Sequence, residues 1–236
     1  MIQTHTTILW ARPHELHIDE MADISYQILT ELNAYGGELD PRYLPGSRKK
    51  DSIEFDLNIE NVKQVLEKNV NKEGDTVFLE LGRHIGLFSS FKEELSSSVG
   101  IRIGNSNPLF NNSVIISLPY GGFSGFDHRR EEFEALLKRI IAIFNPYFAF
   151  VENSLNKQLS DEFWSKKKDK PTYVHWMNYY DKATSKAIGK NRLVKLGQCE
   201  PLGEGYFLKL QDMPIDINNP EQLENQRQVS LQLGLL

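Results

Sequence analysis

The sequence predicts an α+β fold, with a mixed, largely antiparallel sheet covered by amphipathic helices in a single domain, residues 1–236. Segments with strand character outnumber the long helical segments, and the two kinds do not alternate strictly, which disfavours a doubly wound α/β fold. The composition is ordinary for a globular protein, since 40% of the residues are hydrophobic and 25% are charged. A chain of 236 residues is long enough for one large domain or two small ones.

The first elements are expected to be a strand and two helices. Thr6–Ala11 (TTILWA) predicts a short strand, which Arg12-Pro13 ends. Apolar residues from Leu16 to Leu32 recur at helical spacing, and Gly36-Gly37 supplies a stop for that helix. Residues 35–54 form a long loop by composition, and helical spacing returns from Asn58 to Val70.

The central part of the chain predicts strands. Val77–Leu81 has the composition of a strand, whereas Ile85–Phe91 is ambiguous. Val99–Ile103 alternates apolar and polar residues, which is the period of a half-buried strand. Val114–Leu118 (VIISL) lacks that alternation and predicts a central strand covered on both faces.

The most regular helical pattern runs from Arg130 to Phe144. Its apolar residues keep the i, i+3, i+4, i+7 spacing of one buried stripe, and Asp127 is the expected N-cap. Asn145-Pro146 ends this helix, and Tyr147–Val151 predicts a buried strand.

The last third of the chain predicts two further strands and a closing helix. Tyr173–Tyr180 is rich in β-branched and aromatic residues, Tyr206–Leu210 is a further strand, and Pro220–Leu235 closes the fold as a helix. Neighbouring residues on a strand face opposite ways, so Trp176 is expected in the core and His175 outward or in a cleft.

The charge and cysteine content restrict the function classes. The formal net charge of −5 does not suit nucleic acid, which calls for basic patches, but it would suit a basic protein partner. Cys199 is the single cysteine, so an intramolecular disulfide is impossible. The N-terminal residues lack a signal-peptide pattern, and no apolar run approaches the roughly 20 residues of a membrane helix, so we expect a cytoplasmic protein.

No motif for catalysis, a cofactor or a metal is specific enough to assign one. The glycine-rich loop around Gly121-Gly122 lies between a predicted strand and helix, but it lacks the Lys-Ser/Thr ending of a phosphate-binding loop. His14, His17 and Glu20 have a spacing that could bind zinc, although helix capping explains them more simply. His175 has no nucleophilic partner in the sequence pattern.

The order of several features suggests a family. They are Leu81-Gly82, Phe88 and Phe91, the segments VGIRIG and NNSVIISLP, the helix leading to Phe144-Asn145-Pro146, YFAFV, VHWMNYY and the Gly205-Tyr206 strand with the closing helix. From about Phe78 onward this layout resembles the bacterial polymorphic-toxin immunity proteins grouped as immunity protein 52. The resemblance implies an α+β protein without catalysis that binds and neutralises a toxin, encoded by an adjacent gene and predicted to be a nuclease.

Such an inhibitor needs a surface complementary to its toxin, with aromatic anchors and acidic groups that mimic nucleic-acid phosphates. We therefore expect the toxin-binding surface among aromatic and acidic residues at loop or helix edges: Tyr120, Phe123, Asp127, Asp161, Glu162 and Trp164. Phe123 and Trp164 have an equal alternative, which is packing in the core. Two other function classes remain open: an enzyme acting on a small molecule or nucleotide near His175 or Gly121-Gly122, and a structural subunit.

Overall fold

One antiparallel sheet organises the chain. The computed structural model describes residues 4–119, 123, 125–156, 171–196 and 198–236. The strands of the large sheet are β1 (His5–Ala11), β2 (Tyr43–Leu44), β3 (Ile53–Glu54), β6 (Leu81–Phe88), β7 (Ser98–Asn105), β8 (Asn112–Ser117), β9 (Phe148–Asn153), β10 (Met177–Tyr180), β11 (Cys199–Leu202) and β12 (Gly205–Lys209). A separate hairpin contains β4 (Lys72–Glu73) and β5 (Thr76–Val77).

The order of strands in the 10-stranded sheet is β11-β12-β10-β9-β1-β8-β7-β6-β2-β3. The α+β class is thereby confirmed. All pairings among the described strands are antiparallel, so the parallel contribution expected for a mixed sheet is not found there.

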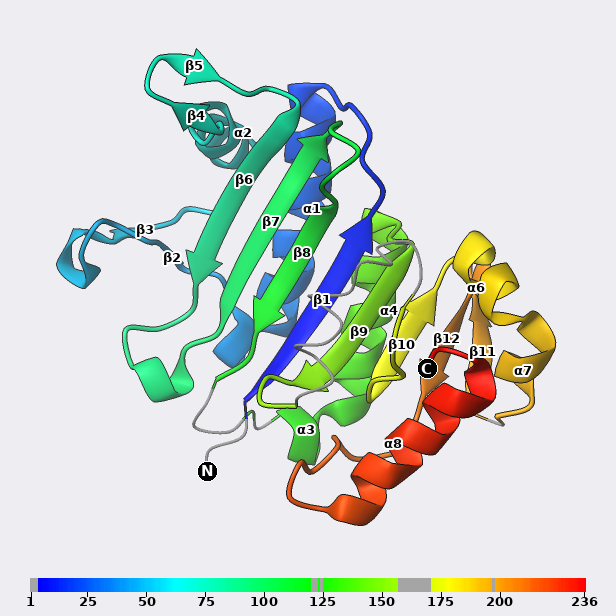
Figure 1. The fold of residues 1–236 in the computed structure, drawn as a ribbon. Coiled ribbons are helices and arrows are strands. Elements are labelled where there is room, and N and C mark those ends of the chain that lie inside the picture. Colours follow the sequence, from blue (N-terminus) through cyan, green and yellow to red (C-terminus); the bar gives the residue numbers. More distant parts are fainter. Residues whose placement is uncertain (1–3, 120–122, 124, 157–170, 197) are drawn as a thin grey trace.

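The helices lie on both sides of the large sheet. They are α1 (Ile18–Tyr35), α2 (Ile59–Lys68), α3 (Gly125–His128), α4 (Arg130–Phe144), α6 (Lys182–Ile188), α7 (Lys190–Val194) and α8 (Pro220–Leu233), with 3-10 turns η1 (Gly37–Leu39), η2 (Lys49–Asp51) and η3 (Glu93–Leu95). Helices α1 and α4 lie behind the sheet, whereas α8 lies on the opposite side near β10 and β12 (Figure 1). On that side Lys190 of α7 lies 5.5 Å from the ring centroid of Tyr206 on β12.

The sheet face opposite α1 and α4 is covered only in part. The strand register places one row of this face at Phe88, Ser98, Ser117, Thr6 and Glu152, from β6 to β9. Ser98 is exposed and Phe88, Ser117 and Thr6 are half-buried, but Glu152 is fully buried. We call the part of this face on β2, β6, β7 and β8 the open half, and the part on β1, β9, β10 and β12 the closed half, so the boundary lies between β1 and β8.

This partial cover corrects the expectation for the segment VIISL. Val114 and Ile116 of β8 are buried against the helix layer, but Ser113, Ile115 and Ser117 are only half-buried. The hydrophobic Ile115 hides the alternation in the sequence, although the strand has one covered face and one partly open face. In Figure 1 no described helix lies in front of β6, β7 and β8.

Several element boundaries also differ from expectation. The ambiguous segment around Ile85 is strand β6, while Val77–Leu81 is a strand only at its first residue and again at its last. The expected loop at 35–54 contains the short strands β2 and β3, which extend the sheet at its edge. The N-cap of α4 is Arg129, not Asp127, which belongs to α3. Helices α6 and α7 and strand β11 are short and were not anticipated.

Strand β10 is shorter than Tyr173–Tyr180. The backbone N–H of His175 donates to Asn178 Oδ1 at 2.8 Å, and Asn178 Nδ2 donates to the carbonyl of His175 at 2.8 Å. Because one side chain satisfies both backbone groups of His175, this residue has no need of a neighbouring strand. The ladder therefore starts at Met177.

Candidate functional site

Few of the residues expected to bind a partner are described. Tyr120, Asp161, Glu162, Trp164 and the Gly121-Gly122 pair lie outside the described residues. Asp127 lies in α3, and its side chain is also outside the description.

Phe123 is described, and it packs in the core, which is the alternative to partner binding that the sequence left open. It is buried with 7% exposure, and its ring lies 4.9 Å from Phe126, 5.5 Å from Phe133 and 6.1 Å from Tyr35, measured between centroids. A ring enclosed by three others presents little area to a partner.

The spacing His14-x-x-His17-x-x-Glu20 serves helix capping. His17 is the N-cap of α1, its side chain accepts from Asp19 N, and Glu20 Oε2 accepts from His17 N at 2.8 Å, which completes a capping box. These bonds satisfy backbone N–H groups that have no partner inside the helix. Within the described ranges, no cluster of three or more His, Cys, Asp and Glu side chains could hold a metal.

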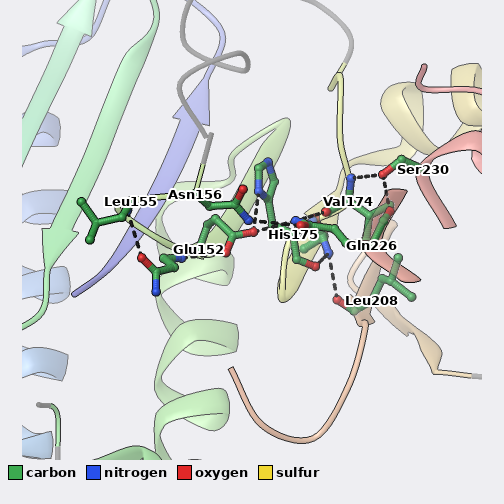
Figure 2. Close-up of polar contacts among 10 residues, drawn as sticks. Glu152, Leu155, Asn156, Val174, His175, Leu208, Gln226 and Ser230 are labelled. Atoms are coloured by element: carbon green, nitrogen blue, oxygen red, sulfur yellow. Dashed lines mark hydrogen bonds and ion pairs between the residues drawn. The ribbon is translucent and has the colours of Figure 1, made fainter. Parts of the chain in front are cut away.

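Figure 2 shows a polar network inside the closed half, at the place where the sequence suggested a catalytic histidine. His175 Nδ1 lies 3.2 Å from Glu152 Oε2, and Gln226 Nε2 of α8 donates to the same oxygen at 2.8 Å. The other oxygen of Glu152 accepts from Asn153 N at 2.7 Å. A buried carboxylate is costly without donors, and here three donors surround it.

Gln226 connects the network to two further segments. Its Nε2 also donates to the carbonyl of Val174 at 2.7 Å, and its Oε1 accepts from Asn156 Nδ2 at 3.1 Å (Figure 2). Ser230, one turn later in α8, accepts from Val174 N at 3.0 Å. The side chains of one helix thus hold the chain segments that flank β9 and β10.

The position of His175 corrects the expectation of an outward or cleft histidine. Its side chain and that of Glu152 are both 0% exposed, as is Trp176. The imidazole stacks on Phe150, with 4.2 Å between ring centroids. A Glu–His pair can orient a general base, but a base must lie within hydrogen-bond reach of its substrate, and solvent does not reach this pair.

A second histidine, His5, lies near this network. It is 9% exposed, and its ring contacts Phe126 at 5.0 Å and Trp176 at 6.3 Å between centroids. Burial lowers the pKa of His5 to about 4, and the nearby Glu152 carboxylate opposes that shift in part. His5 is therefore neutral at pH 7.

The open half carries a cluster of aromatic residues that sequence reasoning missed. Tyr43, Phe88 and Phe91 have centroid separations of 4.5 Å for Tyr43–Phe91 and 5.4 Å for each of the other two pairs. Phe91 is 38% exposed, while Tyr43 and Phe88 are half-buried. We call these three residues, with Glu54 opposite Tyr43 on β3, the aromatic edge.

A groove adjoins the aromatic edge at Glu54. It has a volume of about 620 Å³, and its walls come from α1, from the segment that precedes β2, from the last residue of β3 and from the segment that leads to α2: Asn33, Asp40, Pro41, Arg42, Glu54, Phe55, Asp56 and Leu57. Three of these side chains are acidic and one is basic. Arg42 Nε pairs with Asp40 Oδ2 at 2.6 Å, and this contact raises the pKa of Arg42.

The remaining two carboxylates of the groove, Glu54 and Asp56, form no ion pair with any described residue. The Asp56 carboxylate accepts from Asn58 Nδ2 at 2.7 Å. The sequence gives little sign of the aromatic edge, because Tyr43 and Glu54 lie in the segment expected to be a loop and Phe88 lies in a segment of ambiguous structure. Only pairing between β2 and β6 brings them together.

Comparisons with known proteins support the fold but assign no family. No family model and no curated protein matches the chain. Among solved structures, the Pseudomonas aeruginosa T6SS protein PA0821 is similar, with a TM-score of 0.63 and 8% sequence identity, over 98% of this chain and 73% of that chain. At this identity the likeness shows a shared fold. Within the part of the chain that the structure describes, no helix is long and apolar enough to cross a membrane.

Proposed function

We propose that this chain is an immunity protein of a bacterial toxin system, which binds a nuclease toxin encoded by an adjacent gene and neutralises it inside the producing cell. The observation that carries the proposal is the fold shared with a T6SS protein over 98% of the chain. The resemblance of its sequence features to immunity protein 52 points the same way. Function here is by binding, and the chain needs no catalytic groups for it.

The exposed chemistry of the open half supports a binding function. Aromatic side chains supply much of the energy of protein interfaces, and acidic side chains attract a basic partner and accelerate association. Both kinds of side chain meet at the aromatic edge. The net charge of −5 would also favour encounter with a nuclease that carries a basic substrate-binding surface.

The competing proposal, an enzyme with its site near His175, draws on the Glu152–His175 contact. Both side chains have no solvent exposure, and the same groups are engaged by Gln226 and Phe150 in holding the fold. These contacts favour a structural use of the pair.

The test of the proposed function is survival of cells that express the product of the adjacent toxin gene, with and without this chain. We expect survival only when this chain is present, together with a stoichiometric complex on co-purification. Cells that die equally in both cases, with a toxin shown to be active, would overturn the proposal. A catalytically dead toxin serves as the control for toxicity unrelated to its activity.

A further inference from the structure

We infer that the aromatic edge and the adjoining groove form the docking surface for a basic protein partner, which inserts a Lys or Arg side chain between Glu54 and Asp56. This inference rests on the proposed function and gives its binding surface. The sequence favoured the glycine-rich loop and the segment around Trp164, which lie mostly outside the described residues, whereas the surface inferred here lies on β2, β3 and β6.

The apolar part of the surface has the features of an interface anchor. Three aromatic rings contact one another in a cluster that leaves Phe91 38% exposed. The neighbours of Phe88 in its row, Ser98 and Ser117, are small and accessible. Because the serine side chains beside the rings are small, a partner can approach closely and enclose the rings. Enclosed aromatic side chains are typical hot spots of protein interfaces.

The surface is also held in place before a partner arrives. Arg42 N donates to the carbonyl of Phe88 at 3.1 Å, and Phe55 N donates to the carbonyl of Arg42 at 2.7 Å. These bonds tie β2 and β3 to β6, so Tyr43 and Glu54 need little ordering on binding. A preformed surface loses less conformational entropy in the complex.

The charge of the groove identifies the chemistry of the partner. Asp40 is already neutralised by Arg42 and also accepts from Asn33 at 2.7 Å. Glu54 and Asp56 remain, both exposed and without an ion pair among the described residues. Two carboxylates beside an apolar anchor complement a cationic side chain on a basic protein.

A second copy of this chain fits the surface less well. In a two-fold symmetric dimer the same patch contacts itself, so the groove, with three acidic side chains and one basic, would face an equally acidic groove. Like charges across an interface oppose association. The surface therefore favours a different, basic protein over self-association.

The experiment measures the affinity of the purified, catalytically inactivated toxin from the adjacent gene for four variants by titration calorimetry. We expect Phe91→Ala and Glu54→Lys each to weaken binding at least tenfold. Two matched variants carry the same kinds of change on exposed residues elsewhere: Phe110→Ala in the turn between β7 and β8, and Asp75→Lys in the turn between β4 and β5. Both should bind within twofold of wild type.

The outcomes distinguish a failure of the docking surface from a failure of the proposed function. Wild-type binding together with twofold or smaller effects of Phe91→Ala and Glu54→Lys would overturn this docking surface and leave the proposed function standing. Absence of wild-type binding to a folded toxin would overturn the proposed function and this inference with it. Circular dichroism melting of each variant shows whether a loss of affinity comes from unfolding, and retained melting temperatures assign the loss to the surface.

Discussion

The two halves of one sheet face differ in what lies on them. In the closed half, α8 covers the strand rows, and buried polar groups meet in a network around Glu152. In the open half, the same rows continue across β8, β7 and β6 as exposed or half-buried residues. Under the proposed function, one sheet uses half of a face for stability and keeps the other half for contact with a partner.

The sharpest comparison lies between two isoleucines that are paired across the boundary. Ile8 of β1 and Ile115 of β8 are register partners, but Ile8 is 0% exposed and Ile115 is half-buried. We expect Ile8→Ala to lower the free energy of unfolding by about 4 kcal/mol through lost burial and a cavity. Ile115→Ala should lower it by about 1 kcal/mol, because that side chain is only partly buried and its loss leaves no enclosed cavity.

Urea denaturation of both variants measures this contrast. Equal losses for the two residues would show that the open half is covered as fully as the closed half. The distinction between the halves would then fail.

The polar network of the closed half predicts the next largest effect. Gln226→Leu preserves the side-chain volume but removes the bonds to Glu152, Val174 and Asn156. We expect a loss of about 3 kcal/mol, since a buried carboxylate and a buried carbonyl each lose a donor. Gln228→Leu is the matched control, because Gln228 lies on the same helix and is exposed. A loss below 1 kcal/mol for Gln226→Leu in urea denaturation would show that the network does not stabilise the fold.

His5 makes the stability of the fold depend on pH. The folded pKa of about 4 lies below the unfolded value of 6.5, so the unfolded chain binds the proton first as the pH falls. The stability that neutral His5 preserves is present above pH 6.5 and is lost on acidification toward pH 4. Between pH 7 and pH 5 we expect this residue to contribute a loss of about 2 kcal/mol.

The comparison of wild type with His5→Phe isolates that contribution. Both proteins lose stability from their other titrating groups, but the variant should lose about 2 kcal/mol less between pH 7 and pH 5. Chemical denaturation at the two pH values measures the difference. Identical pH dependence of the two proteins would show that His5 does not carry the effect.

The smallest effect on stability is expected in the open half. Glu54→Gln removes a charge from an exposed residue that has no ion pair among the described residues, so the free energy of unfolding should change by less than about 0.5 kcal/mol. The association rate with the toxin should nevertheless fall a few-fold at low salt, and less at high salt, because screening weakens steering. Stopped-flow kinetics at two ionic strengths would detect this. A salt-independent effect would argue against electrostatic attraction at Glu54.

The sequence predicted most of the long elements because their signals are local. The apolar stripe of α4 and the alternation in β7 depend on residues close together in the chain, and both elements are where they were expected. The sequence did not reveal which face of β8 is open, since Ile115 is apolar although α1 and α4 cover only the other face. Which face of a strand is buried depends on where helices from other parts of the chain pack against the sheet.

The candidate surface was hidden for a related reason. Tyr43 and Phe88 are 45 positions apart by their numbers and meet only through the pairing of β2 with β6. β2 and β3 are two residues long each, so the segment has the composition of a loop. His175 was misplaced because strand alternation was extended to residues that precede the ladder, where Asn178 takes its backbone bonds.

Hydrogen–deuterium exchange of this chain, alone and in complex with the inactivated toxin, tests the central claim most directly. The account predicts new protection in β2, β3, β6 and the segment around Phe91, with α8 and β10 unchanged. Protection confined to α8, α7 and β11, with the aromatic edge exchanging as in the free protein, would contradict it.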